Sequence, residues 1–249
     1  MLQTNNVHHL KDVTNPVLFG VAPDSLEGLF RRQPVEHLCA GQSLFLEGDA
    51  ARHLFEVVEG SLRIFRIISD GRRVITGFLH AGDMAGVSMT GNYLYSAEAV
   101  VDARIRRVSR KLFDAEVAKS PELQLEVFSL LREEMADAQD QMVLLSRKSA
   151  EERLCSFLLR QAEAARGARA NAGIVELPMT RLDIADYLGL TIETVSRTIT
   201  KLTQRGIICP VGRHAVQLLK HGVLVQLSGD GEYFSDGCRQ ISYAAGNHH

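Results

Sequence analysis

The chain has 249 residues, of which 45% are hydrophobic, and its formal net charge is −2. This length is sufficient for two domains, and the hydrophobic fraction is ordinary for a soluble globular protein. Because the sequence contains no run of about 18 apolar residues and no apolar signal core at its N-terminus, we expect a cytoplasmic protein without a membrane span.

Charge is distributed unevenly along the chain. The segment 178–221 carries a net charge of +3, which leaves −5 for the remainder. Its six basic residues are Arg181, Arg197, Lys201, Arg205, Arg213 and Lys220, and its three acidic residues are Asp183, Asp186 and Glu193. A basic module on an acidic body is typical of a protein that meets phosphate at one end.

The four cysteines, Cys39, Cys155, Cys209 and Cys238, lie far apart and form no C-x-x-C pair. A disulfide framework or a zinc finger needs closer, repeated spacing. We therefore expect neither, and we assign no metal ligand and no bound cofactor.

The N-terminal part begins with a polar segment, 1–22, which we interpret as a flexible arm. Residues 24–32 favour a short helix with Leu26, Leu29 and Phe30 turned inward.

From residue 35 to about residue 107, β-prone runs alternate with glycines, and Asp70-Gly71 has the composition of a hairpin turn. The runs are SLFLE, HLFEVVE, SLRIFRIIS, RRVITGFL and SAEAVVDARIRRV. Short strands with such spacing indicate a β-sandwich or barrel. We place this domain at 23–119.

A long helix is predicted for 120–147, because Ser120, Pro121 and Glu122 form a strong helix start. Apolar residues follow at alternating spacings of three and four, the repeat of a coiled-coil seam. The seam residues are Phe128, Leu131, Met135, Ala138, Met142 and Leu145. The stripe either packs on the chain's own β-domain or mediates self-association, and its narrowness favours a homodimer.

A second domain, 148–226, begins at Ser149 and Glu152, which have the spacing of a capping box. The helix that follows should bury Leu154, Phe157 and Leu158 and end near residue 165, before a loop that reaches residue 173. We treat 227–249 as a C-terminal extension, because it has no helix period.

The stretch from Thr180 to Gly206, where the glycine ends the second helix, predicts two helices joined by a short turn. Thr180 and Asp183 have the spacing of a helix start, Gly189 interrupts the pattern, and Thr191 is a plausible N-cap for the second helix. This is the outline of a helix-turn-helix. Two short β-prone runs around 210–212 then indicate a wing.

The second helix has two distinct faces. The apolar face carries Val195, Ile199 and Leu202, and the polar face carries Glu193, Ser196, Arg197 and Thr200. Arginine, glutamate and serine side chains at the start of such a helix can bond to base edges in a major groove.

The segment MTRLDIADYLGLTIETVSRTITKLTQRGII resembles the winged helix of the CRP/FNR transcription regulators, and ETVSR resembles the recognition-helix core of the FNR and FixK branch. Residues 35–107 resemble the jelly-roll sensor domain of that family, including turns at Gly48-Asp49 and Gly82-Asp83. The resemblance implies an α+β fold with a cyclic-nucleotide-binding-like β-roll, a dimerisation helix and a winged helix-turn-helix.

The resemblance also implies a function. Glu193, Ser196 and Arg197 match the family's base-reading residues, and Ile192 with Ser196 points to an FNR/FixK half-site, TTGAT, in an inverted repeat. A FixK-like regulator would act with RNA polymerase as an activator of low-oxygen, anaerobic-respiration or nitrogen-fixation genes. The side chains that we assign to DNA phosphates are Thr180, Thr194, Lys201 and Arg213.

Two features of the sequence bear on the signal that controls such a regulator. The segment GVSMTGNYLYSAEAV resembles the family's phosphate cassette, but Val87 replaces its glutamate and Tyr95 its arginine, so we predict no cyclic-nucleotide binding. An FNR-type iron–sulfur cluster is not expected, because no cysteine precedes Cys39.

Other possibilities remain open for single residues. A haem-based nitric-oxide sensor would draw on His37, His53 and His80, which are otherwise core histidines. Cys209 is either a redox-sensitive thiol or an apolar filler beside the isoleucines that precede it.

One motif bears on catalysis. Gly86-Val87-Ser88 begins like a nucleophile elbow, but Thr90 occupies the second glycine position. We therefore expect no enzyme and assign no catalytic residue.

Overall fold

The computed structural model describes residues 25–87, 91–166 and 173–229. The predicted arm at 1–22 lies outside these residues, as do most of the predicted loop after residue 165 and all but the first residues of the predicted extension.

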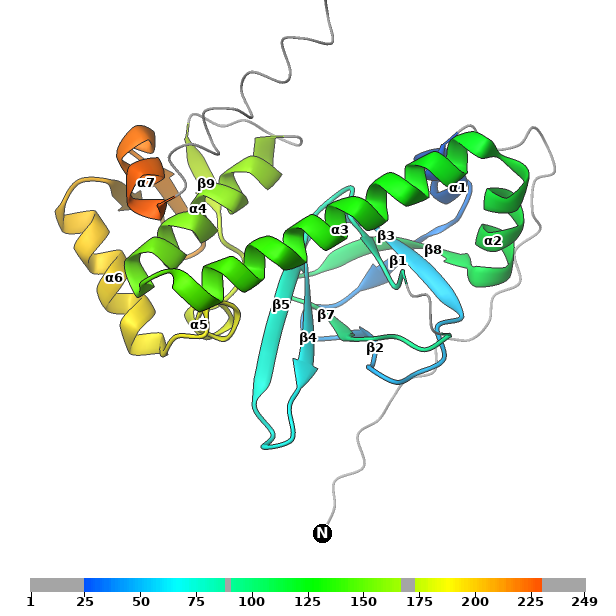
Figure 1. The fold of residues 1–249 in the computed structure, drawn as a ribbon, viewed down its shortest axis with the longest axis horizontal. Coiled ribbons are helices and arrows are strands. Elements are labelled where there is room, and N and C mark those ends of the chain that lie inside the picture. Colours follow the sequence, from blue (N-terminus) through cyan, green and yellow to red (C-terminus); the bar gives the residue numbers. More distant parts are fainter. Residues whose placement is uncertain (1–24, 88–90, 167–172, 230–249) are drawn as a thin grey trace, which may run out of the picture.

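The N-terminal domain is a β-roll of two facing antiparallel sheets (Figure 1). Strand order is β1-β8-β3-β6 in one sheet and β2-β7-β4-β5 in the other. The strands are β1 (Val35–Leu38), β2 (Ser43–Phe45), β3 (His53–Glu59), β4 (Leu62–Ile67), β5 (Arg73–Leu79), β6 (Met84–Ala85), β7 (Ser96–Ala99) and β8 (Ala103–Ser109). Phe45 and Ala97 of one sheet pack on Phe55 and Ile105 of the other, so the core lies between the sheets.

Two short helices complete this domain. The predicted inward residues of α1 (Leu26–Arg31) are buried, which confirms that helix. The helix α2 (Arg110–Lys119) was not predicted, although the Ser109 hydroxyl accepts a hydrogen bond from the Leu112 amide and thereby caps it. The apolar side chains of both helices pack into one cluster.

One predicted strand is divided in the structure. The run SAEAVVDARIRRV forms β7 and β8, which belong to opposite sheets, because residues 100–102 carry the chain from one sheet to the other. Strand propensity cannot reveal such a crossing, because Val100 and Val101 between the two strands are themselves β-prone.

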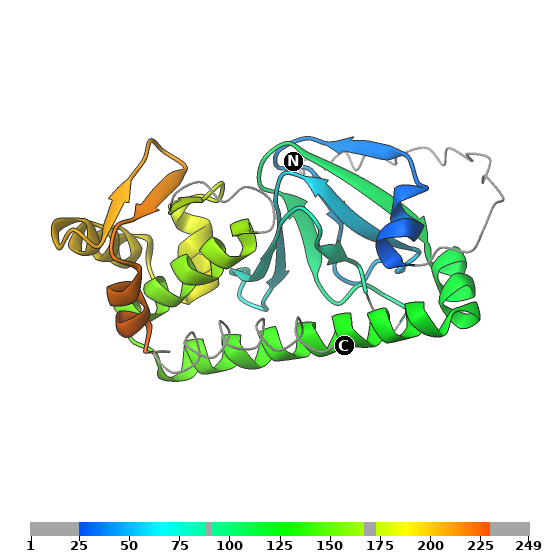
Figure 2. The ribbon, with the colours of Figure 1, turned by 90° about the horizontal axis from the view of Figure 1, so that it is seen from above.

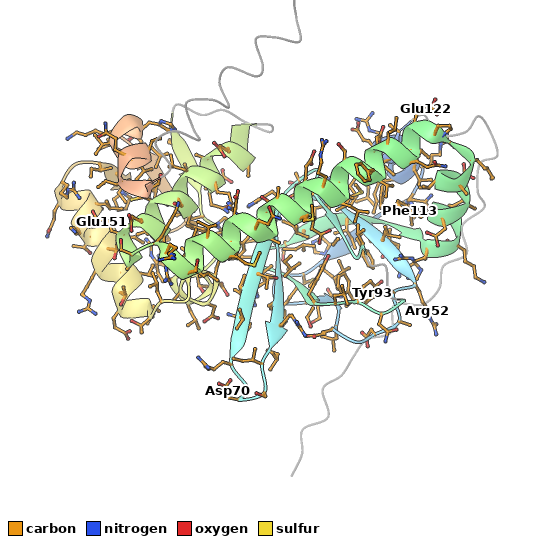
Figure 3. The ribbon with its side chains drawn as sticks, in the orientation of Figure 1. Arg52, Asp70, Tyr93, Phe113, Glu122 and Glu151 are labelled. Atoms are coloured by element: carbon orange, nitrogen blue, oxygen red, sulfur yellow. The ribbon has the colours of Figure 1, made fainter. Side chains whose placement is uncertain are left out.

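The β4–β5 hairpin turns where the sequence predicts. Gly71 has φ of +85°, and the Ile68 amide donates to the Arg72 carbonyl at 3.0 Å. A positive φ favours glycine, which has no Cβ to clash. The hairpin extends away from the rest of the β-roll, with Asp70 at its tip (Figure 3).

The helix α3 (Pro121–Arg147) runs along both domains (Figure 2). Its start is confirmed, because the Ser120 hydroxyl accepts from the Leu123 amide at 3.2 Å. Within α3 only Leu123 and Leu144 are buried, Leu123 among the helices α1 and α2 and Leu144 in the C-terminal core. These two contacts, near opposite ends of α3, tie it to both domains.

The C-terminal domain consists of helices around a small sheet of order β10-β11-β9. Its elements are α4 (Ala150–Arg166), β9 (Ile174–Glu176), α5 (Arg181–Leu188), α6 (Ile192–Gln204), β10 (Ile208–Pro210), β11 (Ala215–Leu218) and α7 (His221–Ser228). The predicted capping box of α4 is confirmed, because the Ser149 amide donates to the Glu152 carboxylate at 2.6 Å. Leu154, Phe157 and Leu158 of α4 are buried as predicted.

Two C-terminal elements were missed. The strand β9 joins the predicted wing strands, and α7 extends two residues past the predicted domain end at Gln226. Within the described residues no helix combines the length and the hydropathy needed to cross a membrane.

Candidate nucleic-acid interface

Helices α5 and α6 form the predicted helix-turn-helix. A full capping box starts α5: the Thr180 hydroxyl accepts from the Asp183 amide at 3.1 Å, and the Asp183 carboxylate accepts from the Thr180 amide at 2.9 Å. Gly189 ends α5 with φ of +62°, and the Leu190 amide donates back to the Ala185 carbonyl at 3.0 Å. The turn geometry therefore rests on the glycine that the sequence marks.

The helix α6 divides into the two predicted faces. The Thr191 hydroxyl caps it by accepting from the Thr194 amide at 3.2 Å. Val195, Ile199 and Leu202 are buried in the C-terminal core. The opposite face is open to solvent and carries Glu193, Ser196, Arg197 and Thr200. The structure thus brings the three predicted base-reading residues together on one exposed face.

Hydrogen bonding within α6 determines what Ser196 can offer a base. Its hydroxyl donates to the Ile192 carbonyl at 2.8 Å, the back-bonding geometry of serine in a helix. Since the hydroxyl hydrogen is already used, Ser196 presents its lone pairs and acts as an acceptor in this conformation.

Glu193 stays ionised at neutral pH. Hydrogen bonds from its own backbone amide, and then from the Thr191 side chain, lower the pKa of its carboxyl. An ionised carboxylate only accepts hydrogen bonds, which suits the exocyclic amino group of cytosine in a major groove.

The four residues predicted to contact phosphate differ in their surroundings. Arg213 is exposed in the turn between β10 and β11, beside Gly212 with φ of +65°. Lys201 instead pairs with Glu151, which lies at the start of α4 (Figure 3). Glu151 also accepts from Arg205 Nη1 at 2.6 Å. Of these two cations, Arg213 is therefore better placed to meet DNA.

The two threonines predicted to contact phosphate are engaged within the chain. The Thr180 hydroxyl donates to Asp183 Oδ2 at 2.7 Å, so donation to a phosphate would replace this hydrogen bond. The Thr194 hydroxyl lies 3.0 Å from the Thr191 hydroxyl. Both residues lie at helix starts, where a phosphate can instead bond to backbone amides.

Cys209 lies in the wing strand β10 with an exposed side chain, 3.7 Å from the Pro210 carbonyl oxygen. The interpretation of Cys209 as an apolar filler is wrong, because the strand turns its side chain outward while Ile207 and Ile208 are buried. Cys155, by contrast, is buried, and burial raises the pKa of its thiol to about 12.

The apolar stripe of α3 is largely unused within the chain. Phe128, Met135 and Met142 are 66%, 60% and 63% exposed, and Leu145 is 37% exposed. The alternative that this stripe packs on the chain's own β-domain is therefore wrong. Exposed Leu125 and Val143 widen the apolar surface beyond the predicted residues.

The cassette segment carries aromatic groups where the resemblance expects a phosphate ligand. The Tyr95 hydroxyl accepts from the Gly86 amide at 3.1 Å, and its ring lies 5.6 Å from that of Phe45. Burial raises the pKa of Tyr95 to about 12, so the phenol stays neutral. These residues do not fit an anionic phosphate; Ser88 and Thr90 lie outside the described residues.

The three histidines considered for haem lie at separate places. His37 is in β1, where its Nδ1 lies 3.8 Å from the Cys39 sulfur, and His53 begins β3. His80 follows β5, and burial lowers the pKa of its imidazole. Among the residues that the structure covers, no three His, Cys, Asp or Glu side chains group as metal ligands.

Sequence reasoning missed the contacts that surround the interface. Glu151 binds Lys201 of α6 and Arg205, the C-cap residue of α6. Arg63 and Arg73 of the β-roll bind carboxylates of α5. These partners are 50 to 120 positions apart in the chain, so no local pattern could reveal them.

The β-roll, the long connecting helix and the winged helix-turn-helix together define a two-domain DNA-binding transcription regulator. Comparison with known families agrees: residues 152–227 match the Crp-like helix-turn-helix domain, and residues 35–120 match the cyclic nucleotide-binding domain. The chain belongs to the CRP/FNR family of transcription regulators and is FixK-like.

The family assignment rests on extensive similarity. The nitrogen fixation regulation protein FixK of Bradyrhizobium diazoefficiens is 40% identical over 172 residues, which cover 69% of this chain and 73% of that protein. FixK of Azorhizobium caulinodans is 41% identical over 187 residues, 74% of this chain and 75% of that protein. The structure of FixK2 from Bradyrhizobium japonicum superposes with a TM-score of 0.74 at 33% identity, covering 78% of this chain and 96% of that one.

Proposed function

We propose that this regulator acts as a homodimer whose two copies of α6 read the half-sites of a TTGAT-type inverted repeat. The observation that carries the proposal is the exposed face of α6, where Glu193, Ser196 and Arg197 project from the N-terminal end of the helix. A two-fold dimer presents two such helices to half-sites one helical turn apart, so the repeat is inverted.

The dimer is supported by the exposed stripe of α3. Apolar side chains in heptad positions along a 27-residue helix form a contiguous surface that a second copy of the same stripe can cover. When the stripe of one copy packs against the same stripe of a second copy, the contact is self-complementary and gives a closed two-fold dimer.

The biological role follows from the relatives. The two FixK relatives are nitrogen fixation regulation proteins. We infer that this chain activates genes of nitrogen fixation or low-oxygen respiration through RNA polymerase. Because Val87 and Tyr95 replace the cassette's ionic residues, we also infer that no cyclic nucleotide controls it.

Band shifts with a duplex that carries the TTGAT palindrome test the proposal. The full-length protein should bind this duplex far more tightly than a duplex of the same composition with scrambled half-sites, at equal salt concentration. Equal affinity for the two duplexes would reject sequence-specific reading.

A further inference from the structure

Two arginines of the β-roll reach the first helix of the helix-turn-helix. Arg63 Nη1 donates to Asp183 Oδ1 at 3.1 Å, and Arg73 Nη2 donates to the same oxygen at 2.7 Å. Arg73 also donates to Asp186 Oδ2, through Nε at 3.1 Å and Nη2 at 3.0 Å. We call these four residues the hairpin clamp, because both arginines belong to the β4–β5 hairpin.

Asp183 divides its two carboxylate oxygens between two tasks. Oδ2 accepts from the Thr180 amide and hydroxyl and so caps α5, while Oδ1 accepts from both arginines. The side chain is only 2% exposed, and a buried carboxylate is costly without such partners. The carboxylate that starts α5 therefore also docks α5 on the β-roll.

Apolar contacts surround the clamp. Phe78 of β5 lies 5.5 Å from Tyr187 of α5 and 6.1 Å from Phe157 of α4, measured between ring centroids. Phe65 and Ile75 of the hairpin belong to the same buried cluster as the C-terminal core. The hairpin therefore forms a continuous interface with the DNA-binding domain, in which the clamp supplies the directional contacts.

The clamp leaves the DNA-reading face free. It holds α5, while Glu193, Ser196 and Arg197 of α6 stay exposed. It also gives cationic partners to Asp183 and Asp186, the two acidic residues of α5, although Arg63 is shared with Glu98 of β7.

We propose that Arg63 and Arg73 are positioning residues for DNA reading, which fix the orientation of the helix-turn-helix relative to the β-roll and α3 of the same chain. In a dimer joined through α3, this orientation sets the distance and angle between the two α6 helices, and hence the half-site spacing that the protein accepts. The consequence for DNA rests on the proposed function; the docking itself does not.

The test uses full-length protein with Arg73→Asp, Asp186→Arg and the double variant that exchanges the two charges. Asp183 is left intact because it caps α5. Arg72→Asp is the matched control: Arg72 neighbours Arg73 but is exposed and pairs with Asp70 at the hairpin tip.

Hydrogen exchange of the DNA-free protein measures the docking. Arg73→Asp should accelerate exchange of the amides in β5 and α5 by about tenfold, and the charge exchange should restore protection, because the residues belong to one ion-pair network. Arg72→Asp should leave these amides unchanged. Equal exchange in the Arg73 and Arg72 variants, or no restoration by the double variant, would overturn the clamp.

Binding to DNA measures the consequence of the clamp for half-site spacing. Two TTGAT palindromes are compared: in one the half-sites lie one helical turn apart, the natural spacing, and in the other two base pairs are added at the centre. Arg73→Asp should lower the preference for natural spacing by about tenfold, and the charge exchange should restore it. Unchanged preference would overturn the positioning role. If the wild-type protein binds neither duplex specifically, the proposed function fails, while the hydrogen exchange still decides whether the clamp exists.

Discussion

Glu193 carries the sharpest expectation for a single residue. Its ionised, exposed carboxylate is suited to accept from a base amino group, so Glu193→Ala should weaken binding to the TTGAT palindrome by about 1 to 3 kcal/mol and relax selectivity at one base pair. Affinities for a set of single-base variants of the duplex measure both effects. Gln204→Ala, exposed at the other end of α6, is the control and should change neither.

The exposed thiol of Cys209 leads to a second expectation at this scale. Oxidation would place added bulk and charge on the wing strand, so peroxide should reduce DNA binding. The Cys209→Ser variant should resist this loss, while Cys39→Ser, which removes another exposed thiol, should remain sensitive. Band shifts after peroxide treatment measure this loss. Equal sensitivity of the Cys209 variant and the wild type would show that Cys209 is not the redox-sensitive residue.

At the scale of elements, α3 carries the prediction on assembly. Met135→Glu combined with Met142→Glu puts two charges into the exposed stripe, and the protein should become monomeric and lose affinity for the palindrome. Light scattering reads the oligomeric state. Ala136→Glu adds a charge to the same helix outside the seam and should leave the dimer intact. A double variant that still forms dimers would refute the assignment of this stripe as the dimer seam.

The junction of α3 and α4 depends on Arg153. Its guanidinium donates to the carbonyls of Lys148, Leu145 and Leu188, each at 2.9 Å, and so joins the ends of α3 and α5. Arg153→Met leaves these helix-end carbonyls without their donor.

We expect Arg153→Met to lower the free energy of unfolding by about 2 to 3 kcal/mol, because the lost hydrogen bonds are charge-assisted. Urea denaturation at one fixed protein concentration measures this, since the stability of a dimer depends on concentration. Arg132→Met, exposed on α3, should have little effect, and an equal loss in both variants would contradict the role of Arg153.

At the scale of the whole molecule, the β-roll belongs to the cyclic nucleotide-binding domain family, but its cassette lacks the family's ionic residues. Calorimetry with cAMP and with cGMP should therefore detect no binding, because neither Val87 nor the neutral Tyr95 can form an ion pair with a phosphate. Submicromolar binding that also changes transcription would contradict this expectation.

Local sequence patterns determined much of the fold and of the reading face. The capping pairs at Ser149 and Thr180, the glycine at 189 and the two faces of α6 depend on residues a few positions apart. Such interactions are visible in the sequence because helix periodicity and capping have fixed spacings. The predicted β-roll, long helix and winged helix-turn-helix were therefore correct as a fold class.

Only the tertiary structure decided which groups far apart in the chain meet. Whether Lys201 is free for phosphate depends on Glu151 of α4, and the docking of α5 on the β-roll depends on Arg63 and Arg73. Each of these charges could pair with many others in the sequence. Folding selects among them because burying apolar surface between β5, α4 and α5 brings particular partners within hydrogen-bond distance.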